Sequence, residues 1–84
     1  MTLAGVASAA GVAGVLLILL AYAAGQIGRL NPLGAKAAGA NLIGACLILW
    51  SLAYDFNLSA VLMEGSWALV SLLGLVNAVV RRRW

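Results

Sequence analysis

The stretch LAGVASAAGVAGVLLILLAYAA, residues 3–24, decides the fold of this 84-residue chain because it contains no charged side chain. Two further apolar stretches follow, at about 34–54 and 58–80. A hydrocarbon core about 30 Å thick takes roughly 20 apolar residues of helix to cross, so each stretch is long enough for one crossing. The sequence therefore predicts an all-α membrane protein with three antiparallel transmembrane helices, forming a single transmembrane domain over residues 1–84.

The composition argues against a water-soluble fold. Hydrophobic residues make up 65% of the chain and charged residues 8%, whereas an ordinary soluble domain is about 25% charged. A chain of 84 residues is too short to enclose that much apolar surface in a core of its own. Nearly every residue belongs to a predicted span, so no room remains for a domain outside the membrane.

The two connections have the composition of turns at a membrane surface. Residues 25–32 contain two glycines and an Asn-Pro step, which favour a turn. Residues 55–57 are short enough for a tight turn, after which Asn57 or Ser59 could cap the third helix. Both connections are short, so neighbouring helices are expected to run in opposite directions.

The basic residues predict the orientation in the membrane. Arg29, Lys36 and the run Arg81, Arg82 and Arg83 all fall on the side that holds the first connection and the C-terminus. Cytoplasmic segments carry an excess of Lys and Arg, so this side is expected to be cytoplasmic. The sequence thus predicts a multi-pass membrane protein with an outward-facing (periplasmic) N-terminus and a cytoplasmic C-terminus.

A cleaved signal peptide is an alternative interpretation of the first apolar stretch. The segment Ala21-Tyr22-Ala23 resembles a small-residue cleavage site. No Lys or Arg precedes the stretch, however, and the first basic residue follows it. This charge order favours an uncleaved transmembrane helix.

The sequence lacks the residues that most cofactors need. It contains no histidine, and its single Cys46 lies within a span without a second cysteine to pair with. Haem and zinc sites depend on such ligands, so we expect no cofactor, no metal site and no enzymatic activity. The run 81–83 directly adjoins a span, which favours contact with anionic lipid headgroups and argues against nucleic-acid binding.

Glu64 is the one side chain that a membrane span disfavours. It follows Asn57 by about 10 Å of helical rise, so its carboxyl lies in the hydrocarbon or just beneath the interface. Asn57, Glu64 and Ser71 recur every seven residues and share one helix face, which we expect to point into a protein contact. Glu64 could bind and release a proton or a cation, or it could form a structural hydrogen bond near Asn57 or with a partner subunit.

Small residues spaced four apart predict close helix contacts in all three spans. The pairs are Ala7 and Gly11, Ala10 and Gly14, Ala21 and Gly25, Ala35 and Gly39, Ala40 and Gly44, and Gly74 and Ala78. At Gly44 and Gly74 we expect a bulky side chain to hold the helices apart. Asn41 lies between Ala37 and Ala45 on its own face, where it could form a specific interhelical hydrogen bond or be a satisfied buried amide with no further role.

Four blocks of sequence after residue 20 carry a resemblance to a known family. The blocks are Ala21-Tyr22 with Gly25, Gly28, Leu30 and Pro32; Asn41-Leu42 with Gly44-Ala45; Ser51-Leu52 with Phe56-Asn57; and Glu64 with Trp67, Ser71-Leu72 and Gly74-Leu75. Together they resemble an uncharacterised family of short bacterial inner-membrane proteins with three predicted transmembrane helices. The resemblance implies that Glu64 belongs to a recurring pattern, and it supplies no activity.

Three short helices expose more surface than they can cover among themselves. The leading hypothesis is therefore a non-enzymatic accessory subunit that packs beside a larger inner-membrane assembly, for instance a respiratory or photosynthetic complex. The alternative is a homo-oligomeric proton or cation channel or transporter in which several copies of Glu64 line a shared path. A third interpretation is a lipid-binding regulator that uses the arginine run at 81–83.

Overall fold

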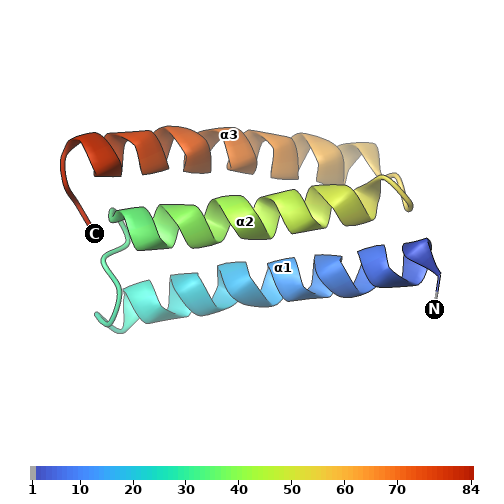
Figure 1. The fold of residues 1–84 in the computed structure, drawn as a ribbon, viewed down its shortest axis with the longest axis horizontal. Helices are drawn as coiled ribbons and strands as arrows, with labels where there is room; N and C mark the ends of the chain where they lie inside the picture. The colour runs from blue at the N-terminus through green and yellow to red at the C-terminus, as the bar shows by residue number, and fades with distance from the viewer. Residues whose placement is uncertain (1) are drawn as a thin grey trace.

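The computed structural model describes residues 2–84 and contains three helices within them. The helices are α1 (Leu3–Gln26), α2 (Ala35–Leu52) and α3 (Leu58–Val80). They lie side by side with α2 in the middle (Figure 1). All three are long and apolar enough to cross a membrane, and the longest dimension of 40 Å compares with about 40–45 Å for a bilayer with its headgroups. The predicted all-α class with three candidate spans is confirmed.

The end of α1 lies two residues beyond the predicted span because a glycine closes it. Gly28 has a φ of 78°, a left-handed conformation that glycine adopts without steric cost. This conformation turns the chain back so that the Arg29 amide donates to the Ala24 carbonyl at 2.9 Å. The pairing is that of a Schellman motif, which satisfies carbonyls that the helix end would leave free.

The end of α3 has the same motif with an arginine in the left-handed position. Arg82 has a φ of 54°, and the Arg83 amide donates to the Ala78 carbonyl at 2.7 Å. The Arg83 carbonyl then accepts a hydrogen bond from the Ala35 amide at 2.8 Å. The residues that follow α3 therefore supply an acceptor to the first turn of α2.

The connection between α2 and α3 begins earlier than the sequence predicted. α2 ends at Leu52 rather than at about 54, because the Tyr54 amide donates to the Ser51 carbonyl in a turn. Asn57 caps α3, as one of the two candidates predicted, with its side-chain oxygen accepting from the Ala60 amide at 3.1 Å. Ser59 lies in the first turn of α3 instead.

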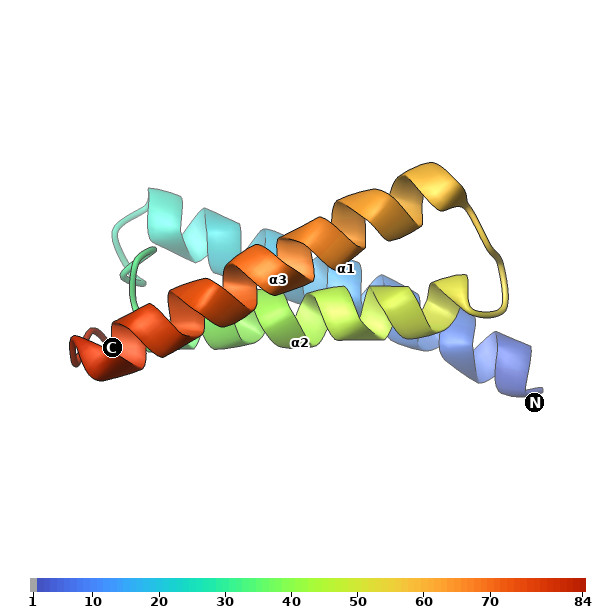
Figure 2. The same cartoon turned by 90° about the horizontal axis from the view of Figure 1, so that it is seen from above.

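Every contact between helices in the described residues involves the middle helix, α2. α2 packs against α1 and against α3, whereas α1 and α3 do not approach each other closely. Seen from above, α1 and α3 cross α2 with opposite inclinations (Figure 2). The arrangement is thus an open layer of helices rather than a closed bundle.

The closest helix contact lies between α1 and α2, where two glycines meet. A Cβ atom built on Gly14 would lie 2.5 Å from the Gly44 carbonyl oxygen, and one built on Gly44 would lie 2.8 Å from the Gly14 carbonyl oxygen. At each glycine a hydrogen occupies the place of the Cβ and points at the opposite carbonyl. Such reciprocal Cα–H···O contacts recur where helices approach closely.

The contact extends along α1 as a stripe of small residues. Its buried members are Ala7, Gly11, Gly14 and Ala21. Their spacing alternates between four and three residues, except that Ile18 occupies the place between Gly14 and Ala21. This spacing keeps one helix face against a neighbour over several turns. The small-residue pairs predicted separately in α1 therefore belong to one continuous surface.

The contact between α2 and α3 is looser at the predicted glycine. A Cβ built on Gly74 would lie 3.9 Å from the Ala38 Cβ, which is an ordinary van der Waals distance. The buried residues of α3 are Ser71 and Ala78. Gly44 thus lies at a close helix contact as expected, whereas Gly74 does not bring the α2 and α3 backbones close together.

We predict that Gly44→Ala destabilises the packing of α1 on α2. The new methyl group would lie 2.6 Å from Ile18 Cγ1 as well as against Gly14. Overpacking of this kind typically costs about 1–3 kcal/mol, so the unfolding temperature in mild detergent should fall. It can be followed by the loss of helical circular dichroism on heating.

The matched control for this experiment is Gly65→Ala in α3. A Cβ at Gly65 meets no atom within 4 Å, and alanine is the better helix former by about 1 kcal/mol. This variant should therefore unfold at the same temperature as the wild type or a higher one. Equal effects of the two substitutions would contradict the α1–α2 contact.

Candidate functional site

Glu64 lies on the face of α3 that packs against α2. Ser71 and Ala78, which follow it at intervals of seven residues, are both buried, and the Glu64 side chain is itself half-buried. The Glu64 Oε2 atom is shielded from solvent, and it accepts no hydrogen bond from any group in residues 2–84. The protein contact that the sequence predicted for this face is thus made by the chain's own second helix.

Asn57 and Ser71, the other members of the predicted Glu64 face, lie in different environments. Asn57 lies at the exposed start of α3, where its side-chain oxygen is engaged as the helix cap. The structural hydrogen bond expected between Glu64 and the region of Asn57 is therefore not formed by Oε2. Ser71 is almost completely buried, with 7% of its surface exposed. The structure brings these residues to one face without joining them in a network.

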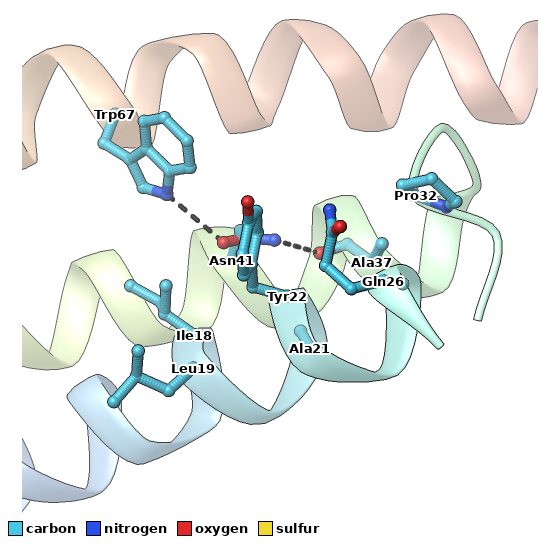
Figure 3. A pocket seen from close by; sticks show the side chains of 10 residues that line it. Ile18, Leu19, Ala21, Tyr22, Gln26, Pro32, Ala37, Asn41 and Trp67 are labelled. Atoms are coloured by element: carbon cyan, nitrogen blue, oxygen red, sulfur yellow. Dashed lines mark hydrogen bonds between the residues drawn. The ribbon is translucent and has the colours of Figure 1, made fainter. Parts of the chain in front are cut away.

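Asn41 forms the interhelical hydrogen bond that the sequence proposed for it. The Trp67 indole Nε1 donates to Asn41 Oδ1 at 3.2 Å, and Asn41 Nδ2 donates to the Ala37 carbonyl one turn earlier at 2.8 Å. Figure 3 shows Trp67 extending from α3 toward the Asn41 amide. Because an amide has two N–H groups and two acceptor lone pairs, Asn41 keeps one donor and one acceptor for further partners.

A cavity of about 280 Å³ opens between α1 and α3, with α2 as its floor; we refer to it as the α1–α3 slot. Its lining consists of Ile18, Leu19, Ala21, Tyr22, Gly25, Gln26, Pro32, Ala37, Asn41 and Trp67 (Figure 3). The volume is close to the lower end, roughly 300 Å³, of sites that bind small molecules. The slot exists because α1 and α3 diverge across α2 and do not contact each other.

The slot lies toward the end of the molecule that carries the basic residues. The connection between α1 and α2 and the C-terminal end lie together at that end (Figure 1). Arg29 lies in the connection, Lys36 in the first turn of α2, and Arg81, Arg82 and Arg83 at the C-terminal end. The Arg81 Nε donates to Asn77 Oδ1 at 2.9 Å. The exposed side chains of all five basic residues are placed to meet anions at one surface.

Sequence reasoning identified the polar residues in the spans but missed the slot. Asn41 and Glu64 stand out in an apolar sequence, and Trp67 belongs to the same block of the family resemblance as Glu64. Tyr22 and Gln26 were not predicted to line a site, because a cavity depends on the relative inclination of helices that are distant in sequence. The residues described contain no group of three or more His, Cys, Asp or Glu side chains that could hold a metal ion.

Comparison with known proteins places the chain in a family. The model of an uncharacterised protein family matches residues 7–83. The chain belongs to this family. The match covers all of α2 and α3 and most of α1, and the three apolar helices of the chain fit a small membrane protein. No curated protein and no solved structure matches the chain.

Proposed function

We propose that this protein is a non-enzymatic accessory subunit that packs beside a larger assembly in the bacterial inner membrane, for instance a respiratory or photosynthetic complex. The observation that carries the proposal is the uncovered outer face of α3. Leu62, Leu69 and Val76 recur every seven residues on it and are exposed by 62%, 58% and 54%. A stripe of this kind suits packing against another membrane helix, and the small, exposed Ser66 between Leu62 and Leu69 could donate a hydrogen bond across such a contact.

The proposal includes an orientation. All five basic residues lie at the end that holds the α1–α2 connection and the C-terminal residues. The positive-inside rule supports a cytoplasmic location for this end, with α1, α2 and α3 crossing the inner membrane in alternating directions. The N-terminus and the α2–α3 connection would then face the periplasm.

The orientation predicts a labelling pattern for cysteines placed in the two connections. Leu33 and Phe56 are both exposed and lie outside the helices. In a Cys46→Ala background, which removes the native thiol, Phe56→Cys should react with a membrane-impermeant thiol reagent added to intact spheroplasts. Leu33→Cys should react only after the membrane is opened. The reverse labelling pattern would contradict the orientation.

The accessory role predicts retention in a large complex. After gentle extraction, the wild-type chain should migrate on a native gel with an assembly much larger than a small homo-oligomer. Leu62→Ala combined with Leu69→Ala should weaken this retention, because the shortened side chains lose contact with the partner helix.

The matched control replaces two exposed leucines of α1, Leu16→Ala with Leu20→Ala, whose side chains are 54% and 67% exposed. This variant should stay in the complex. A wild-type chain that runs only as a monomer or a small homo-oligomer would overturn the accessory role.

The second candidate function is a homo-oligomeric proton or cation channel or transporter that uses Glu64. The observation that favours it is the shielded Oε2 atom without a hydrogen-bond donor in the described chain. An unpaired polar atom in a membrane is costly and often belongs to an ion pathway. Against it, Glu64 points toward α2, whereas a path shared among copies needs the carboxyl on an outer face.

Glu64→Gln separates the two functions. Glutamine keeps the shape of the side chain but cannot titrate. For an accessory subunit, the variant should be retained in the complex like the wild type, and reconstituted vesicles should show no proton or cation flux for either protein. Flux through the wild type that disappears in Glu64→Gln, with the oligomer intact, would establish the transport function instead.

A further inference from the structure

We propose that the α1–α3 slot binds one acyl chain of an anionic phospholipid whose phosphate lies beside Arg29 and Lys36. The site is independent of the accessory role, because it lies between α1 and α3 and not on the outer face of α3. The argument rests on the depth of the slot, on its free hydrogen-bonding groups and on the charges at its end.

The slot has the depth and lining that suit the upper part of a lipid chain. Gln26 ends α1 at the membrane surface, and Ile18 lies eight residues deeper, about 12 Å along the helix. At the deep end the lining is mostly apolar, with Ile18, Leu19 and Ala21 on one wall. The volume of about 280 Å³ is too small for a whole lipid but accommodates a segment of one chain.

Hydrogen-bonding groups line the slot at three different depths. Tyr22 contributes a hydroxyl and Gln26 an amide, and Asn41 keeps one N–H after its bond to the Ala37 carbonyl. Ester carbonyls accept hydrogen bonds but cannot donate them. Gln26, at the shallow end, is placed to donate to an ester carbonyl, whereas Tyr22 lies about 6 Å deeper along α1 and Asn41 lies about 9 Å along α2 from its first residue.

The charges at this end of the molecule favour a negative headgroup. Arg29 follows the last slot residue of α1 by three positions, and Lys36 directly precedes Ala37 on the slot floor. Both side chains are exposed and hence available to a phosphate. Asp55 and Glu64 would repel an anion, but both lie toward the opposite end of the molecule. Asp55 belongs to the α2–α3 connection and Glu64 to the second turn of α3. A neutral hydrocarbon ligand would leave these two cations without a role.

The first experiment uses the full wild-type chain in mild detergent and native mass spectrometry. Phosphatidylglycerol and phosphatidylcholine with identical acyl chains are offered in equal amounts. The proposal expects one retained phosphatidylglycerol, preferred at least about tenfold, since a Lys or Arg near the surface each strengthens binding severalfold. Equal retention of the two lipids, or retention of a neutral isoprenoid in place of either, would overturn the proposal.

Paired variants then locate the lipid. Leu19→Trp fills the slot and should abolish retention, whereas Leu16→Trp on the same helix, outside the slot lining, should retain the lipid as the wild type does. Arg29→Gln with Lys36→Gln should remove the preference for phosphatidylglycerol, while Arg81→Gln with Arg82→Gln, which loses the same charge, should keep most of it. Helical circular dichroism verifies folding of each variant.

The controls can also overturn the proposal. Undiminished binding by a folded Leu19→Trp variant, or equal loss from Leu16→Trp, would place the lipid elsewhere on the surface. Equal loss of headgroup preference from both charge variants would mean that only the general surface potential attracts anionic lipids.

Discussion

The backbone contact between Gly14 and Gly44 is the constraint on which the arrangement of the helices depends. In a membrane the hydrophobic effect does not drive helices together, so close packing and short polar contacts must do so. Here the two carbonyl oxygens approach the opposite glycines so closely that no side chain fits between them. This contact fixes where α1 crosses α2, and the residues on either side of it adapt to that crossing.

The slot is a consequence of the same crossing. α1 and α3 both pack on α2 but incline in opposite directions, so they do not close over it. Trp67 and Asn41 connect α2 with α3 at the slot, and a single interhelical hydrogen bond of this type contributes about 0.6–2 kcal/mol in a membrane. The open layer is thus stabilised by two pairwise contacts, α1 with α2 and α2 with α3.

The sequence predicts the positions of the helices more closely than the contacts between them. The spans follow directly from hydrophobicity. α3 begins at the predicted residue 58 because a capping asparagine precedes it, and it ends at the predicted residue 80, directly before the arginine run. The end of α1 was less predictable, since it depends on the left-handed conformation of Gly28. The inward direction of Glu64 was predicted from heptad spacing, but its contact with α2 rather than with another chain requires the packing angles. Gly74 shows the limit of motif reasoning, because spacing alone does not measure how closely two helices approach.

The distribution of polar groups connects the two proposals without making either depend on the other. α3 turns Glu64 and Ser71 toward α2, and its free face carries leucine and valine together with the exposed Ser59 and Ser66, whose hydroxyls need hydrogen-bond partners on association. Gln26, Tyr22 and Asn41 line the slot between α1 and α3, in the half of the molecule that carries the basic residues. A lipid held there would bridge two helices that otherwise do not meet, and it would leave the outer face of α3 available to a protein neighbour. Loss of the lipid and loss of the neighbour are therefore separable: substitutions in the slot should change lipid retention, and substitutions on the stripe of Leu62, Leu69 and Val76 should change assembly.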